Sequence, residues 1–522
     1  MKTKLIIFLI LLLGITLRLI YFRQPTTFFY DQARDAISSL EIWQNDPIKI
    51  IGPASDTQGL FHGPLYWYLI SPFYYFSNGN VWVVRLLLIL INCVNIFVIY
   101  KFTESLFKNK KISFLASFLF AISFEAIQYA RWLSNPGPAI LTINLSFWSL
   151  YMLIKGKKWA LVSLFFFWGL SIQLQLFLLY QSVIFLIVWL LVKGFKIPKV
   201  PVKIYLAASA TFLITISSYI ISEIKFKFQG SKALLGLVSE NNVSTNIFQS
   251  IKLFIKNLNL VTYHNIAGIN KQYALILLVL IILLTLVSIR KNNNKNSLII
   301  LLVWLFSPII AYILKGPNSY FLNIGILVPL IILSSYLLVS YSKKYLAITI
   351  VIIAISVYGN IFQVITKNKE GEILFTVQEQ MILGNELKVI DWIYKESEGK
   401  SFKLNTITAP MFINTTWSYL FNWYGLNKYD YMPYWWGETQ VDVPGSKIKF
   451  ADKSNSNLHF LIIEPRSTDD KVYINAIISL ENTRSKVIKT EKIGTFTVEK
   501  REITTPRIFT SEDVFYLVQE KK

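Results

Sequence analysis

The sequence predicts a polytopic α-helical membrane protein with about eleven spanning helices, followed by a C-terminal α/β domain outside the membrane. The 522 residues are 54% hydrophobic and only 16% charged, a composition that suits neither a single soluble domain nor a disordered chain. Apolar runs of about 20 residues, the length that crosses a bilayer, recur from Lys4 to Val364. From Thr366 onward, charged and apolar residues interleave and no run is long enough to span.

The spanning helices are predicted at residues 4–22, 81–106, 112–130, 139–154, 159–175, 177–192, 204–222, 273–289, 297–314, 321–341 and 345–364. The first run lacks a small-residue cleavage site, which predicts an uncleaved helix. An odd number of crossings that starts inside ends outside. Residues 1–365 therefore form a predicted membrane domain, and residues 366–522 form a predicted extracytoplasmic domain.

Basic residues gather in every second loop and set the orientation. The formal net charge is +22, but lysine and arginine are concentrated in short loops, as at Lys155, Lys157 and Lys158 and at Lys193, Lys196 and Lys199. Basic loops stay on the cytoplasmic side, so we expect a plasma-membrane protein with a cytoplasmic N-terminus. A patch that binds anionic lipid is the alternative explanation of these lysines. Nucleic acid is not an expected partner.

The sequence lacks the residues that several classes of reaction require. The single cysteine, Cys93, makes no intramolecular disulfide and no multi-cysteine metal site. The sequence contains no glycine-rich phosphate loop, Ser-His-Asp set or HExxH motif. Nucleotide-driven chemistry is therefore not expected.

The first external loop, residues 23–80, carries the candidate site. A helix is predicted to open at Tyr30 and to run to about Gln44. Asp31 lies in its first turn, where the helix dipole favours an anion, and Arg34 follows three residues later on the same face. An ordinary helix start with an acidic residue is the plainer interpretation.

His62-Gly63-Pro64 precedes an aromatic segment that begins at Leu65 and is too short to span. Its tyrosines and tryptophan, Tyr66 among them, suit a helix lying at headgroup level. His62 is a candidate metal ligand or proton carrier, although a lone histidine at a helix start more often only hydrogen-bonds the backbone.

Further charges are predicted at the same external rim: Arg85, Glu125, Arg131 and Lys315. A charge at the rim costs less than one at mid-membrane, so each is also explained as an interfacial anchor. Together with Asp31 they suit a lipid phosphate whose tail stays in the bilayer.

With these motifs in this order, the chain resembles the polyprenyl-phosphate-dependent GT-C glycosyltransferases, in particular the protein O-mannosyltransferase and aminoarabinose-transferase group. The segment from Asp31 to Asp35 is similar to their Asp-Glu-x-Arg-Tyr motif, and the segment from His62 to Trp67 to their Lys-Pro-Pro-Leu-Tyr-Tyr helix. Arg85-Leu86 matches the Arg-Leu pair that opens the second helix. The segment Ser319-Tyr320-Phe321-Leu322 is weakly similar to the Arg-Tyr-Leu motif that opens one of their late helices.

The resemblance implies transfer of a sugar from a polyprenyl-phosphate donor to a lipid, glycan or protein hydroxyl on the external face, with inversion. It implies Asp31 as catalytic base and Arg34, Arg85 and Lys315 as partners of the donor phosphate. Asp35, His62, Tyr66, Arg131 and Tyr320 follow as candidate substrate-binding residues. The sequence departs from the family at Gln32, Asp35 and His62. It therefore leaves the sugar undetermined, and also whether a divalent metal binds at Asp31 and His62.

Two other classes compete with this hypothesis. An O-antigen ligase or polymerase would also use a lipid donor, but typically with a large late loop. A lipid-glycan flippase or transporter would be expected to show a repeat between its halves and broken or polar helices near mid-membrane. Neither feature is evident in the sequence.

The tail is predicted to contain a helix at 373–394, strands at 402–407, 458–463 and 486–498, and a helix through 476–480. The aromatic stretch Trp417–Trp436 is either a platform for a sugar or the core of this domain, and the core is the favoured interpretation.

The lysine distribution makes a test of orientation possible. In a Cys93→Ala background, Lys157→Cys should resist an impermeant thiol reagent in intact cells, whereas Ser454→Cys should be labelled. The opposite labelling pattern would reverse the predicted orientation.

Overall fold

The computed structural model describes residues 2–23, 25–55, 57, 59–239, 247–291, 294–314, 319–375, 378, 380–438, 448–451, 455–465 and 471–520. Contacts divide the chain into two compact units. The first, here the helical unit, comprises Met1–Ile20, Ile48–Leu69 and Arg85–Asn368. The second, here the sheet unit, comprises Tyr21–Pro47, Ile70–Val84 and Lys369–Lys522.

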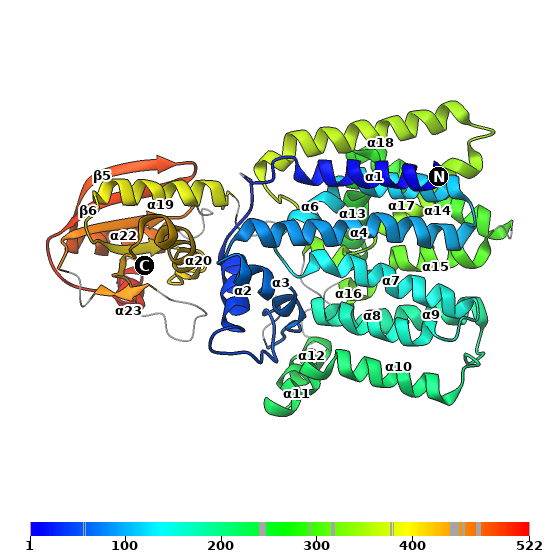
Figure 1. Ribbon diagram of the computed structural model, residues 1–522, viewed down its shortest axis with the longest axis horizontal. Coiled ribbons are helices and arrows are strands. Elements are labelled where there is room, and N and C mark those ends of the chain that lie inside the picture. The colour runs from blue at the N-terminus through cyan, green and yellow to red at the C-terminus, as the bar shows by residue number, and fades with distance from the viewer. Residues whose placement is uncertain are drawn as a thin grey trace. The chain divides into compact units, whose positions relative to one another are not determined.

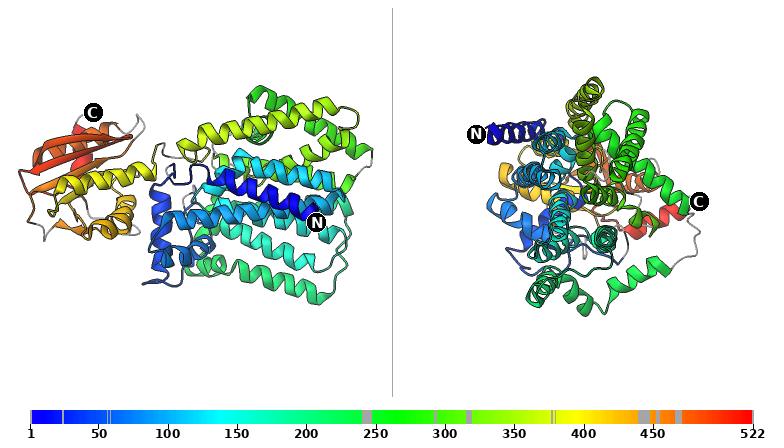
Figure 2. Two further views of the ribbon diagram at one scale, coloured as in Figure 1. Left: turned by 45° about the horizontal axis from the view of Figure 1, so that its top comes forward. Right: turned by 90° about the vertical axis from the view of Figure 1, so that its right-hand side faces the viewer.

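The helical unit is a bundle whose helices run roughly alongside one another (Figure 1), and the right-hand view of Figure 2 looks along most of them. Its helices are α1 (Lys2–Leu19), α4 (Val81–Phe107), α5 (Lys110–Ile122), α6 (Phe124–Arg131), α7 (Pro136–Ile154), α8 (Ala160–Leu174), η1 (Leu176–Tyr180), α9 (Gln181–Lys193), α10 (Val202–Thr215), α11 (Ser217–Lys225), α12 (Gln229–Ser239), α13 (Ile247–Thr262), η2 (Tyr263–Ala267), α14 (Lys271–Arg290), α15 (Lys295–Phe306), α16 (Ile309–Ile313), η3 (Tyr320–Asn323), α17 (Leu327–Tyr341) and α18 (Leu346–Lys367).

Among the described residues, six helices are long and apolar enough to cross a membrane, or up to eight if each of two bent pairs is one span. The helices α8 and α17 are apolar but shorter. Each of the eleven predicted spans coincides with a helix or a broken helix of the structure. The helical membrane architecture is thus present, and the count of eleven crossings stays a prediction.

Two of the apolar spans are broken. The α5–α6 pair bends by 55° and the α10–α11 pair by 56°. At the first break, the Ser123 hydroxyl accepts a hydrogen bond from the Ala126 N–H (3.0 Å), and the Asn360 side chain accepts one from the Phe124 N–H (2.8 Å). Side chains therefore replace the helical partners that the break removes, as a buried helix end requires.

The helix α13 begins in the described chain at Ile247. One face buries Phe254, Leu258 and Val261 and packs against α14 and α16. After η2 the chain turns at Gly268, whose φ is +62°. A Cβ there would lie 2.4 Å from the Cα of Gly359 in α18, so the two backbones cross at a distance that only glycine permits.

The sheet unit contains α2 (Tyr30–Glu41) and a six-stranded sheet of order β3-β2-β1-β4-β6-β5. Its strands are β1 (Lys403–Ile407), β2 (Tyr434–Trp435), β3 (Lys449–Phe450), β4 (Leu458–Ile463), β5 (Ser485–Ile493) and β6 (Phe496–Ile503). The strands β1 to β4 pair in parallel, with Leu404 opposite Phe460, and β6 runs antiparallel to both β4 and β5.

Helices cover both faces of this sheet. Phe460 contacts Trp392 of α19 (Leu383–Ser397), which crosses the sheet in Figure 1. Leu461, the next residue of β4, points to the opposite face. There it packs in a core with residues of α22 (Lys471–Arg484) and α23 (Ser511–Glu520). The tail thus contains a sheet with helices, and its placement outside the membrane stays a prediction.

The tail differs from its predicted elements in two places. The predicted strand 486–498 is a hairpin, because Gly494 adopts a φ of +60° and reverses the chain between β5 and β6. The predicted helix 373–394 begins only at Leu383. Within Trp417–Trp436, the side chains of Trp417, Trp435 and Trp436 are buried, as the core interpretation expects.

The contact between Gly268 and Gly359 makes a test of the fold possible. Gly268→Ala should lower the free energy of unfolding by at least about 2 kcal/mol, because the residue is left-handed and its Cβ meets backbone. The midpoint of thermal unfolding in detergent measures the loss. As a control, Gly236→Ala in α12 places its Cβ in open space and should leave the midpoint unchanged or slightly raised. Equal midpoints for the two variants would contradict the crossing.

Candidate functional site

The helix α2 begins where the sequence predicts it. The N–H of Phe29, its N-cap residue, donates to the Gln32 side chain (3.2 Å), which closes half of a capping box. Asp31 lies in the first turn, near the free N–H groups and the positive end of the helix dipole.

Arg34 joins two carboxylates of α2. Its Nη1 lies 2.7 Å from Asp31 Oδ1, and its Nη2 and Nε lie 2.9 Å and 3.1 Å from Asp35 Oδ1. The Asp31 side chain is 42% exposed, whereas those of Arg34 and Asp35 are 12% and 4% exposed. Asp31 is therefore the carboxylate of this group that faces solvent.

The ion pairs dominate the electrostatics of Arg34. Burial alone would lower the pKa of its guanidinium, but the charges of Asp35 and Asp31 outweigh burial and raise that pKa. Its guanidinium also lies over the ring of Tyr30, 5.6 Å from the ring centroid.

Segments of the tail hold the chain that leads into α2. The Phe28 N–H donates to the Met381 carbonyl (3.1 Å), and the Leu383 N–H donates to the Thr26 carbonyl (2.8 Å). The Thr27 N–H donates to a carboxylate oxygen of Glu372 (2.9 Å). These bonds place the entry to α2 in a short antiparallel bridge with the tail.

Aromatic packing continues this attachment. The ring of Phe28 lies 5.5 Å from that of Tyr419, and α2 packs against α20 (Thr415–Leu420). The Tyr419 hydroxyl donates to the Gly79 carbonyl. The candidate site helix is therefore part of the sheet unit, although the sequence alone assigned its loop to the membrane domain.

His62 lies in the helical unit, in the loop that precedes α3 (Leu65–Phe76). Its Nδ1 accepts a hydrogen bond from the Leu176 N–H (3.1 Å), at the break between α8 and η1. The next residue is tightly packed, since the Gly63 N–H donates to the Gln173 carbonyl (2.9 Å) and a Cβ there would meet the Gln173 side chain. His62 is thus anchored to the break in the α8–η1 segment.

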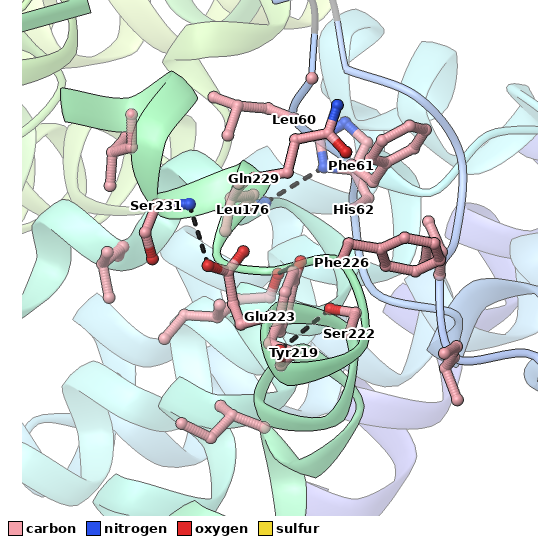
Figure 3. A pocket seen from close by; sticks show the side chains of 18 of the residues that line it. Leu60, Phe61, His62, Leu176, Tyr219, Ser222, Glu223, Phe226, Gln229 and Ser231 are labelled. Carbon is pink, nitrogen blue, oxygen red and sulfur yellow. Dashed lines mark hydrogen bonds between the residues drawn. The ribbon is translucent and has the colours of Figure 1, made fainter. Parts of the chain in front are cut away.

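A cavity of about 510 Å³ opens beside His62 within the helical unit (Figure 3). Its apolar wall comes from the loop, α8, η1, α10, α11 and α12, and includes Leu60, Phe61, Trp168, Phe212, Phe226 and Leu234. Its polar groups are His62, Tyr219, Ser222, Glu223, Gln229 and Ser231. A mainly apolar cavity with a few polar groups suits an amphiphilic ligand.

Hydrogen bonds fix several of these polar groups. The Tyr219 hydroxyl donates to the Ile172 carbonyl (3.1 Å), and the Ser231 N–H donates to Glu223 (3.0 Å). The Glu223 contact, drawn in Figure 3, joins α11 to the first turn of α12.

The remaining predicted site residues belong to the helical unit. Tyr66 of α3 and Arg85 of α4 are buried. Arg131, in the last turn of α6, is buried and donates to the Ile20 carbonyl (2.9 Å). Tyr320 of η3 is partly buried and interacts with Glu125. Lys315 lies outside the described residues.

Glu125 was missed as a member of a buried network. The prediction of a rim anchor is wrong here, because its side chain is fully buried and accepts a hydrogen bond from Asn265 (2.5 Å). Asn360 in turn donates to the Asn265 carbonyl (3.0 Å). The local signal was an acid two residues after the serine at the helix break.

No group of three or more His, Cys, Asp or Glu side chains that could hold a metal comes together in the part of the chain that the structure describes. Asp31 and His62, the two predicted candidates, belong to different units.

The anchor of His62 makes a test possible. His62→Ala leaves the Leu176 N–H without this acceptor and should lower the free energy of unfolding by about 1–3 kcal/mol. His62→Asn retains an acceptor of similar reach and should lose less. The midpoint of thermal unfolding measures both, and equal losses would show that the hydrogen bond does not matter.

Comparison with known proteins supports the architecture. Residues 61–221 match the family model described as dolichyl-phosphate-mannose-protein mannosyltransferase. The comparison with curated protein sequences found no match.

Solved structures match over almost the whole chain. ArnT from Cupriavidus metallidurans bound to undecaprenyl phosphate is similar with a TM-score of 0.61 at 10% identity, over 94% of this chain and 97% of that chain. The apo state of the same protein is similar with a TM-score of 0.61 at 10% identity, over 96% of this chain and 98% of that chain. A third similar structure is the archaeal oligosaccharyltransferase AglB from Archaeoglobus fulgidus, in complex with an inhibitory peptide and a dolichol-phosphate. Its TM-score is 0.51 at 12% identity, over 95% of this chain and 74% of that chain.

At these identities the likeness to solved structures shows the fold, and the family model adds sequence similarity over the segment from Phe61 to Ile221. The predicted resemblance to the polyprenyl-phosphate-dependent GT-C glycosyltransferases is therefore confirmed: the chain is a multi-pass helical membrane protein with the fold of that group.

Proposed function

We propose that this protein transfers a sugar from a polyprenyl-phosphate donor to an acceptor hydroxyl on the extracytoplasmic face of the membrane, with inversion at the anomeric carbon. One observation carries the proposal. In a chain with this fold, Asp31 presents a half-exposed carboxylate at a helix start and is braced there by Arg34. The acceptor is a lipid, a glycan or a protein.

The cavity beside His62 supports a lipid donor. Its wall is apolar along α8, α10, α11 and α12, which suits an isoprenoid chain. Polar side chains, His62 and Ser231 among them, are available to the phosphate end. The bound undecaprenyl phosphate of ArnT and the dolichol-phosphate of AglB are the same chemical class of ligand.

Cations stabilise the leaving phosphate in this proposal. Arg34, Arg85 and Lys315 are the proposed partners of this phosphate. A hydrogen bond to a charged phosphate contributes about 1.5–3 kcal/mol, and the contribution grows as charge develops on the leaving group. We further propose that three other residues bind the substrate: Tyr66, Arg131 and Tyr320.

The reaction exchanges one bond at the anomeric carbon for another. The acceptor oxygen attacks that carbon from the face opposite the phosphate. The bond from carbon to phosphate oxygen breaks, and its electron pair leaves with the polyprenyl phosphate. Asp31 takes the acceptor proton as general base. Asp35 is not suited to this role, because its carboxylate is buried against Arg34.

The test begins with a panel of undecaprenyl-phosphate and dolichyl-phosphate sugars supplied to the purified protein, with release of polyprenyl phosphate as the readout. On the accepted donor, Asp31→Asn should reduce turnover by about 10²–10⁴-fold, the usual share of a general base. Asparagine keeps the size of the side chain and an oxygen that accepts from Arg34, so folding and donor binding should persist.

Asp35→Asn is the matched control in the same helix, and its turnover should fall less. Near-normal turnover by Asp31→Asn would contradict the assignment of the base. A folded protein that releases polyprenyl phosphate from no donor in the panel would contradict the proposed reaction.

A further inference from the structure

A second, basic cavity of about 330 Å³ lies between the loop that joins α7 to α8 and the loop that joins α9 to α10. These loops lie at the end of the helical unit that also holds the N-terminus of α1 (Figure 1). Five lysines line the cavity: Lys155, Lys158, Lys193, Lys196 and Lys199. Its volume lies within the range of about 300–1,000 Å³ that is usual for small-molecule sites.

Within the described residues, no acidic side chain pairs with these lysines. The sequence contains no aspartate or glutamate between Glu125 and Glu223, a segment that includes both loops and the helices α7, α8, α9 and α10. A concave site lined by several unpaired ammonium groups attracts an anion from outside the chain.

The loop that follows Lys193 and carries Lys196 and Lys199 is folded into a defined shape. The Trp189 indole N–H donates to the Lys196 carbonyl (2.7 Å), which ties the loop back to α9. The Tyr205 hydroxyl donates to the Pro198 carbonyl (2.5 Å), which ties it to α10. Gly194, with a φ of +66°, makes the turn at the end of α9. The lysines are thus held around the cavity and are not scattered along a free loop.

The surroundings place this cavity at the edge of the bilayer. Two candidate spans, Pro136–Ile154 and Leu176–Lys193, end beside it. Phe195 and Ile197, next to the lysines, are 95% and 77% exposed. Bulky apolar side chains beside lysines at the end of a span suit the interface, where the apolar groups enter the lipid and the ammonium groups meet the headgroups.

We propose that this cavity binds the phosphate-bearing headgroup of an anionic membrane lipid. The ammonium groups contact the phosphate, and Phe195 and Ile197 contact its acyl chains. The site is separate from the cavity beside His62, carries no reacting group and does not depend on the proposed sugar transfer. It gives the basic loops a ligand in addition to their effect on topology.

The test uses the full chain in a nonionic detergent, titrated with phosphatidylglycerol or phosphatidylcholine and followed by native mass spectrometry. Phosphatidylglycerol should bind about tenfold more tightly or better, because each lysine near an anionic headgroup contributes about 1 kcal/mol. The double variant Lys158→Gln with Lys196→Gln should weaken phosphatidylglycerol binding by about 25-fold, or about fivefold for each lysine. Binding of phosphatidylcholine should not change.

The matched control is the double variant Lys157→Gln with Lys203→Gln. It removes the same charge from the same end of the unit, but neither residue lines the cavity, so phosphatidylglycerol binding should be nearly retained. Equal losses in the two double variants, or no preference for phosphatidylglycerol, would overturn the proposal. If inorganic phosphate at the same concentration competes as well as the lipid does, the ligand is a free anion and the lipid assignment is wrong.

Discussion

A bend in a helix exposes N–H groups that hydrocarbon cannot satisfy, so a spanning helix breaks only where other protein groups take over its hydrogen bonds. The α5–α6 break meets this condition because two side chains accept its N–H groups: Ser123, at the break itself, and Asn360 of α18. Asn265 of η2 then links Asn360 to Glu125. One break thereby joins three segments that are distant in sequence.

The sequence predicted the positions of the helices because apolar length is a local property. It did not predict the breaks, since the partners that permit them lie far away along the chain. Glu125 shows the consequence. Its distance from the end of a predicted span suggested an exposed anchor, whereas Asn265, 140 residues later, makes a buried position tolerable. Gly494 shows the local counterpart: it makes the turn of a hairpin within the run 486–498, which is predicted as one strand.

The candidate site was predictable to the same extent. The spacing of Asp31 and Arg34 predicts one helix face, and the structure joins the two side chains. That Asp35 shares the same guanidinium follows only from the rotamer of Arg34 in the folded chain. No pattern in the sequence predicts the hydrogen bond between Thr27 and Glu372, which are 345 residues apart.

That bond, and the contact of Phe28 with Tyr419, mean that the framework of the proposed base is shared between the two ends of the chain. The tail is not an accessory that can be exchanged freely. In a chimera with the tail of a relative, the residues that contact the chain before α2 would differ. Such a chimera would need matching residues at Thr27 and Phe28 to keep Asp31 in place. Substitutions in these two segments are therefore expected to evolve together, so that the loop and the tail behave as one inherited module.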